Sequence, residues 1–260
     1  MLSSLKLKNK LQNHQFTLGS WISLAHPSIA EILCDAGFDW LTIDLEHSSI
    51  SLREAEDLIR VIDLKDVCPI VRVSSHNESQ IKRLLDAGAK GIIVPNICSS
   101  KEVKLIHSWM HYPQHGGNRG VGLSRAQKYG NSFSSYMNTV SNEIPLIVQI
   151  ESTKAVENIE SILSCNEVDA LMIGPYDLSS SLGVPGDFNH PKYLEAVSTV
   201  RDCAIKYSKA FGIHLVEPDL EKLEAEKKNG AKFIAYSVDF KFLDCEARKA
   251  VSLFKALKDL

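Results

Sequence analysis

Two acidic residues, Glu151 and Asp177, stand at the ends of apolar runs rich in β-branched residues. The runs are residues 144–151 and 168–177, and residues 153–163 between them have a helical pattern. Continuous apolar runs separated by one helix are typical of buried parallel strands, whose carboxyl ends share one working face. Two carboxylates on that face predict a divalent-cation site with positions open to water and substrate. The alternative is that one or both only cap the next helix or pair with an arginine.

A third apolar run, residues 40–45, ends beside Asp44, Glu46 and His47. Strand alternation puts Asp44 and Glu46 on one face, and the bend into the following loop brings His47 back toward the same end. A histidine near a carboxylate predicts a general base, because its unperturbed pKa lies close to neutral. The alternative for His47 is a helix cap or a core side chain.

Arg72 stands between Val71 and Val73 in a candidate strand over residues 69–74. Its apolar neighbours and the parity of the strand favour an inward orientation. An inward guanidinium needs a partner, which is either a protein carboxylate or an anionic substrate. If Arg72 faced outward, it would be an ordinary solvated residue. We expect the inward orientation.

Strand candidates recur along the whole chain, and each is followed by a helical pattern. The eight strands are expected at residues 16–24, 40–45, 69–74, 91–95, 146–151, 170–174, 212–216 and 233–238. The helices between and after them are expected at residues 28–36, 52–62, 79–87, 101–110, 153–163, 192–207, 220–229 and 243–257. Gly37, Gly88 and Gly230 suit the left-handed position that ends a helix. Since no glycine-rich nucleotide motif is present, the pattern predicts one (β/α)₈ barrel domain over residues 1–260.

Two segments depart from this repeat. Residues 111–142 contain a glycine-rich polar loop and are longer than an ordinary connection, so we expect an active-site flap. The final helix, expected over residues 243–257, carries Val251, Phe254 and Leu257 as an apolar stripe. Such a stripe on a terminal helix indicates a subunit contact.

Composition restricts the kind of partner. The formal net charge of −3 comes from interspersed acids and bases, which argues against nucleic acid or a membrane surface and favours a small-molecule substrate. The six cysteines include no C-x-x-C pair, as expected for reduced core residues of a cytoplasmic protein. We expect neither a signal peptide nor a membrane span, because the apolar runs are too short.

In combination, these motifs resemble the HpcH/HpaI family of metal-dependent aldolases, which is grouped with citrate lyase β-subunits. The resemblance covers residues 19–239. It rests on stretches that follow one another in family order: AGFDW (36–40), IDLEH (43–47), VRV (71–73), QIKRLLDAG (80–88), RGVG (119–122), QIE (149–151) and IGPYDLS (173–179).

The resemblance implies a class II aldolase that reversibly cleaves a 4-hydroxy-2-oxo acid to pyruvate and an aldehyde. It implies that Glu151 and Asp177 hold a divalent cation, Mg²⁺, Mn²⁺ or Co²⁺. Arg72 would contact the C2 oxygen of the keto acid. His47, oriented by Asp44, would be the base for the hydroxyl proton.

For substrate binding, the resemblance implies that Gln149 steadies the site. The backbone from Gly174 through Pro175 and Tyr176 to Asp177 would receive the pyruvate carboxylate. Relatives assemble as hexamers of swapped dimers, so the resemblance also implies a homo-oligomer built as a trimer of dimers. A CoA-thioester lyase of the citryl or malyl type is an alternative on the same barrel, and a non-catalytic ligand-binding barrel is a more distant one.

The chain departs from this family pattern near its seventh strand. His214 and Glu217 stand where relatives tend to have aliphatic and then small or amide residues, so a hydroxylated aldehyde is as plausible as an aromatic-degradation intermediate. The alternative is that His214 is a packed barrel residue. Trp21 would wall the pyruvate end or fill the core, and Tyr176 would narrow the mouth. The strands of this face carry no lysine, which argues against a Schiff-base aldolase.

Overall fold

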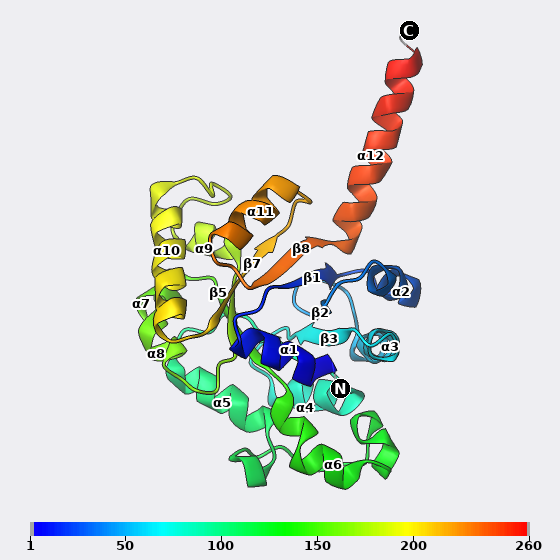
Figure 1. Cartoon of the computed structure of the whole chain (residues 1–260), viewed down its shortest axis with the longest axis vertical. Helices are drawn as coiled ribbons and strands as arrows, with labels where there is room; N and C mark the ends of the chain where they lie inside the picture. The colour runs from blue at the N-terminus through cyan, green and yellow to red at the C-terminus, as the bar shows by residue number, and fades with distance from the viewer. Residues whose placement is uncertain (1–2, 259–260) are drawn as a thin grey trace.

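Eight parallel strands pair in chain order, and β8 closes back onto β1 to form a barrel (Figure 1). The computed structural model describes residues 3–258. The strands are β1 Thr17–Ile22, β2 Trp40–Asp44, β3 Cys68–Arg72, β4 Ile92–Val94, β5 Leu146–Ile150, β6 Ala170–Ile173, β7 Ala210–Leu215 and β8 Phe233–Val238. This closed ring with helices around it confirms the predicted (β/α)₈ barrel.

The predicted helices are also present. They are α2 Pro27–Asp35, α3 Leu52–Leu64, α4 Glu78–Ala87, α5 Ser100–Met110, α7 Thr153–Glu157, α8 Ile159–Leu163, α10 Pro191–Lys206, α11 Leu220–Lys228 and α12 Asp239–Lys258. Local sequence explains their ends. Ser51 and Glu54 form a capping box that starts α3, and Gly88 takes the left-handed conformation (φ 107°) that ends α4. Asn158 divides the helix expected over residues 153–163 into α7 and α8.

One further helix, α1 (Ser3–Gln12), has no counterpart in the sequence prediction. Its Leu7 and Leu11 pack in one apolar cluster with Trp40 and Phe233, the first residues of β2 and β8. Helix α1 therefore closes the barrel at the N-terminal ends of the strands, and the C-terminal ends are left for the site.

The side chains that point into the barrel are stacked in layers, and each layer takes its side chains from alternate strands. Following the register around the barrel puts Trp21, Arg72, Gln149 and His214 in one layer, from β1, β3, β5 and β7. This layer lies at the C-terminal ends of the strands and is largely polar. The interior below it is filled by apolar side chains such as Ile70.

The long segment over residues 111–142 packs near the N-terminal ends of the strands. Arg119 forms an ion pair with Asp86 in the last turn of α4, and Arg125 pairs with Asp63 in the last turn of α3. Both helix ends lead into the first residues of the next strands. The predicted active-site flap is therefore wrong within one copy of the chain, because the buried Arg119 anchors this segment away from the mouth.

The last helix, α12, begins at Asp239, earlier than predicted, and projects away from the barrel (Figure 1). Its Leu243, Val251 and Phe254 side chains are exposed. The side chain of Leu257, the third member of the predicted stripe, lies outside the described part of the chain. Within residues 3–258, no helix combines the length and the apolar character needed to cross a bilayer.

Candidate active site

The C-terminal ends of the strands surround a cavity of about 280 Å³. Most of the predicted site residues line it, together with three apolar side chains. The lining consists of Trp21, His47, Arg72, Gln149, Met172, Ile173, Gly174, Pro175, Tyr176, Asp177, His214 and Val216. Of the remaining predicted residues, Asp44 contacts Arg72 and Glu151 contacts Gln149. The structure thus brings the predicted residues together at one end of the barrel.

Arg72 faces the barrel interior, as predicted, and forms a buried ion pair with Asp44. The register places these last residues of β3 and β2 side by side, and Arg72 Nε and Nη2 donate to the two Asp44 carboxylate oxygens at 2.9 and 2.7 Å. Burial opposes ionisation of Asp44, but Arg72 and the backbone N–H groups of Glu46 and His47 outweigh burial and lower its pKa. This two-point contact fixes the plane of the guanidinium.

His47 lies at the rim of the cavity, with 63% of its side chain exposed. Its backbone N–H donates to Asp44 Oδ1 at 3.3 Å, whereas its ring Nε2 lies 4.0 Å from Glu46 Oε2. The expected pairing of the His47 ring with Asp44 is therefore absent among the described contacts. The physical reason is that both Asp44 carboxylate oxygens already accept hydrogen bonds from Arg72.

Burial and neighbouring charge shift the pKa of two carboxyl groups at the mouth, Glu46 and Glu151. Burial raises the pKa of Glu46 to about 7, with Arg72 opposing the shift and Asp44 and Asp177 adding to it. Burial also raises the pKa of Glu151 to about 7, and the charges of Glu46 and Asp177 contribute. When ionised, Glu46 and Glu151 place repelling negative charge in poorly solvated surroundings, and of the two only Glu46 has a cationic partner among the described residues, Arg72.

An unpartnered oxygen atom and an absent side chain mark where a cation fits this cluster. Gln149 Oε1 is buried without a hydrogen bond from any described residue, whereas Glu46 Oε2 forms an ion pair with Arg72 Nη1 at 3.0 Å. A Cβ atom on Gly174 would lie 2.5 Å from Glu151 Oε2 and 2.7 Å from Gln149 Nε2, so glycine keeps this space open. No three His, Cys, Asp or Glu side chains within residues 3–258 are grouped to hold a metal alone. A cation held by Glu151 and Asp177 would complete its shell with water and substrate oxygens.

A short helix, α9 (Pro175–Ser181), begins directly after β6 and carries Asp177 to the mouth. Gly174 is its N-cap residue. Tyr176 and Asp177 belong to its first turn, whose N–H groups have no acceptor within the helix. Because both residues also line the cavity, an anionic group bound there can use these N–H groups.

Trp21 lies between Arg72 and His214. Arg72 Cζ is 4.3 Å from the indole centroid, and the His214 ring stacks on the indole at 4.9 Å with an angle of 10° between planes. In the strand order β3 lies to one side of β1 and β7 to the other, so Trp21 stands between the two groups in the polar layer. Trp21 therefore both fills the core and lines the cavity. Glu217 instead pairs with Lys241 at 2.6 Å and does not line the cavity, so its predicted contribution to the pocket is wrong.

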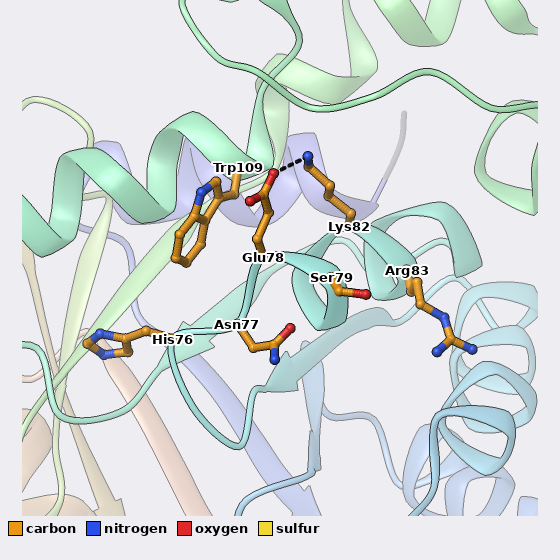
Figure 2. Close-up of a pocket in the computed structure, with 7 residues that line it drawn as sticks. All are labelled: His76, Asn77, Glu78, Ser79, Lys82, Arg83 and Trp109. Carbon is orange, nitrogen blue, oxygen red and sulfur yellow. Dashed lines mark hydrogen bonds and ion pairs between the residues drawn. The ribbon is translucent and has the colours of Figure 1, made fainter.

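A larger hollow of about 580 Å³ lies outside the barrel, beside the start of α4 (Figure 2). Glu78 and Lys82 pair with each other on its wall, and His76 Nε2 contacts the Pro95 carbonyl oxygen at 2.8 Å. Trp109 completes the lining. The smaller cavity at the strand ends is the better candidate for chemistry, because it combines burial with carboxyl groups of raised pKa.

Two residues of the site have no role in the sequence prediction. Glu46 belongs to the acidic cluster, and its spacing from Asp44 is the signal for this, since alternate strand residues share a face. Asn96 has a left-handed backbone (φ 55°) and donates its N–H to Glu151 Oε1 at 2.6 Å. Pro95 and Asn96 together signal a turn, but a turn signal does not reveal the partner of the N–H group.

Comparisons with known proteins agree with this site. The family model for HpcH/HpaI aldolase/citrate lyase matches residues 17–244. A hydroxypyruvate/pyruvate aldolase of Paraburkholderia phytofirmans is 36% identical over 94% of this chain and 95% of its own length. A 2-keto-3-deoxy-L-rhamnonate aldolase of Shigella boydii is 31% identical over 97% and 94%. The crystal structure of an HpcH/HpaI aldolase/citrate lyase family protein from Burkholderia cenocepacia superposes with a TM-score of 0.91 at 31% identity, covering 96% and 99%.

The fold and the site define a barrel enzyme whose mouth combines a buried acidic cluster with a fixed guanidinium. The chain belongs to the HpcH/HpaI aldolase/citrate lyase family. It is a carbon–carbon lyase, an aldolase of the class II, divalent-metal-dependent type, and it catalyses reversible aldol cleavage. The predicted family and reaction class are therefore confirmed.

Proposed function

We propose that this aldolase cleaves a 4-hydroxy-2-oxo acid to pyruvate and an aldehyde, and catalyses the reverse addition. The acidic cluster beside Arg72 is the observation that carries the proposal. Cleavage leaves negative charge on the keto oxygen as an enolate, so positive charge must already be aimed at that oxygen before reaction. Relatives named for hydroxypyruvate, pyruvate and a 2-keto-3-deoxy acid support a 2-oxo acid as substrate.

Each group at the mouth then has a distinct task. Glu151 and Asp177 would hold the cation, and Mg²⁺, Mn²⁺ or Co²⁺ bound there supplies positive charge for the enolate. Gln149 donates its amide N–H to Glu151 and thereby steadies that carboxylate. Arg72, fixed by Asp44, would donate a hydrogen bond to the keto oxygen.

Proton transfer and carboxylate binding involve the rim of the cavity. His47 would take the proton of the 4-hydroxyl group, and its exposed ring can pass that proton to solvent. The start of α9, from Gly174 through Pro175 and Tyr176 to Asp177, would receive the pyruvate carboxylate, and the backbone N–H groups of Tyr176 and Asp177 are the donors that remain for it. Burial of the first strand's Trp21 beside Arg72 would keep water from the keto oxygen.

One set of assays tests this mechanism against its competitors. We expect EDTA to abolish pyruvate release from a 4-hydroxy-2-oxo acid and Mn²⁺ to restore it. Borohydride added with pyruvate should label no lysine, because no lysine in the described part of the chain lines the cavity. A pyruvate adduct trapped on a lysine would overturn the metal-dependent mechanism. Cleavage of malyl-CoA without cleavage of free hydroxy-oxo acids would favour a thioester lyase instead.

We also propose a homo-oligomer, such as a trimer of dimers, in which copies exchange α12. Leu243, Val251 and Phe254 are exposed on α12, and no residue of α11 is buried, so apolar surface on one copy remains for another to cover. The scattered cysteines, which include no C-x-x-C pair, support a reducing compartment, the cytoplasm. A monomeric mass in light scattering would overturn the oligomer.

A further inference from the structure

His214, near the end of β7, uses one ring nitrogen to bond the protein. Its Nε2 lies 3.1 Å from the carbonyl oxygen of Ser237 on β8. A carbonyl oxygen only accepts hydrogen bonds, so Nε2 carries the proton and donates it. The other ring nitrogen, Nδ1, makes no hydrogen bond to any residue in the described part of the chain.

The surroundings of His214 keep its ring uncharged. Burial lowers the pKa of His214 to about 4 and Arg72 adds to the shift, although the hydrogen bond to Ser237 opposes it. Trp21 stands between the ring and Arg72 in the polar layer and contacts both groups. A neutral imidazole protonated at Nε2 has its lone pair at Nδ1. Nδ1 is therefore a hydrogen-bond acceptor at neutral pH.

This acceptor is open to the cavity. His214 lines the cavity and is only half-buried, and its Nδ1 is not among the buried atoms that lack a partner. The lining from the same side of the barrel, Met172 and Val216, is apolar. The indole Nε1 of Trp21 is buried and offers no accessible donor. A donor for Nδ1 must come from what enters the cavity.

We propose that His214 selects aldehydes that carry a hydroxyl group on the carbon next to the aldehyde carbon. This inference rests on the proposed function. Arg72 and the acidic cluster would hold the keto acid on one side of Trp21, which leaves the side of His214 for the aldehyde. A hydroxyl group donates to Nδ1, an alkyl group leaves the lone pair unsatisfied, and a carboxylate opposes it with a second acceptor.

The preferred cleavage substrates are then 4,5-dihydroxy-2-oxo acids. The C3–C4 bond breaks, the 4-hydroxyl group loses its proton, and C4 becomes the aldehyde carbon. The bond electrons pass to C3 as the enolate, which takes up a proton and becomes the pyruvate methyl group. The 5-hydroxyl group remains on the aldehyde beside its carbonyl carbon, in reach of His214.

Glycolaldehyde and propanal provide a matched test, because they differ only by a hydroxyl group in place of a methyl group. Addition of pyruvate to each is measured with Mn²⁺ for the parent protein, His214→Phe and His214→Asn. Phenylalanine retains a ring to stack on Trp21 but has no nitrogen. Asparagine retains both an acceptor and an N–H donor for Ser237. The ratio of kcat/KM for glycolaldehyde to kcat/KM for propanal cancels differences in folded fraction and in intrinsic aldehyde reactivity between variants.

We expect the ratio to fall by about tenfold or more in His214→Phe, because a site built around a hydroxyl group discriminates strongly against its loss. His214→Asn should stay within about threefold of the parent ratio. His115→Phe, which removes a ring contact with the Met137 carbonyl oxygen in the segment at the opposite end of the barrel, is the control and should keep the parent ratio. If His214→Phe is insoluble, His214→Leu takes its place. A ratio in either apolar variant within about twofold of the parent ratio would overturn the inference.

A separate measurement distinguishes this failure from failure of the proposed function. Exchange of the pyruvate methyl protons for deuterium, followed by NMR in D₂O with Mn²⁺, needs no aldehyde and should persist in the His214 variants. If the variants exchange the methyl protons but keep the parent ratio of glycolaldehyde to propanal, only the proposed role of His214 is wrong. Absence of both exchange and addition in the parent protein defeats the proposed function, and this inference with it.

Discussion

The two ends of the barrel treat charged side chains in opposite ways, since one end pairs them and the other leaves carboxyl groups in excess. At the N-terminal ends of the strands, Arg119 pairs with Asp86, and Asp63 pairs with both Lys90 and Arg125. These pairs join the ends of α3 and α4 to the long segment after α5. Charge at this end therefore joins parts of the chain that are far apart in sequence.

At the C-terminal ends of the strands, carboxyl groups outnumber their partners. Among the described residues of this cluster, the Arg72 guanidinium stands with four carboxyl groups, those of Asp44, Glu46, Glu151 and Asp177. Buried like charges weaken a fold unless something outside the chain balances them. The comparison teaches that the paired end is organised for stability and the unpaired end for a cation and a substrate.

The largest expected effect tests the unpaired end at Glu151. Glutamine keeps the size of this side chain but removes its charge, so Glu151→Gln should lower kcat/KM for cleavage by roughly 10²–10³-fold. The metal-free variant should unfold at the same temperature as the metal-free parent or higher, because a negative charge beside Glu46 and Asp177 is gone. Glu157→Gln, an exposed acid of α7, is the control and should change neither quantity. Loss of thermal stability together with activity would show that the cluster stabilises the barrel.

The next effect tests the paired end at Arg119. This side chain is fully buried, its Nη2 lies 2.6 Å from Asp86 Oδ1, and its guanidinium lies 4.8 Å from the Tyr112 ring centroid. Arg119→Ala should lower the free energy of unfolding by about 2–3 kcal/mol, less than for a fully buried pair because Asp86 remains partly exposed. Lys206→Ala, which breaks an exposed pair with Glu160 at the end of α10, is the control and should leave the thermal midpoint unchanged. If Arg119→Ala had the same thermal midpoint as the parent, the ion pairs at this end would not stabilise the fold.

The part of the structure that follows from local pattern could be predicted from the sequence. The strands are apolar runs of characteristic length, and Glu151 and Asp177 stand where two such runs end. The left-handed glycine after α4 follows from the conformational freedom of Gly88. The closed barrel follows in turn, because eight strand and helix units in alternation leave few other arrangements.

The part that depends on contacts between distant residues could not be predicted. Asp44 binds Arg72 rather than the His47 ring because the register of β2 and β3 brings their last residues together. The position of the segment after α5 depends on the burial of Arg119 against Asp86, which no local pattern records. Helix α9 is too short for a helical period to appear in its sequence.

The smallest expected effect concerns pH and the same acidic cluster. Glu46 and Glu151 each have a pKa raised from 4.5 to about 7, so the metal-free native protein binds protons more tightly than the unfolded chain does. The contribution of these groups to stability therefore falls as the pH rises from about 4.5 to about 7. A cation takes the place of these protons, so the stabilisation conferred by Mn²⁺ should increase over the same range.

Three histidines act in the opposite direction, and the measurement must remove their contribution. Burial lowers the pKa of His111 and of His214 from 6.5 to about 4 and also lowers that of His107, so all three favour the folded state increasingly as the pH rises toward 6.5. They are present with and without Mn²⁺, so the difference between the metal-bound and metal-free thermal midpoints cancels their effect. The difference between the two midpoints should grow from about pH 5 to about pH 7 in the parent. In Glu151→Gln the same difference should depend much less on pH. If this difference between the midpoints did not change with pH in the parent, protons would not occupy the acidic cluster of the metal-free protein. The contrast between the two ends of the barrel would then depend on ion pairing alone.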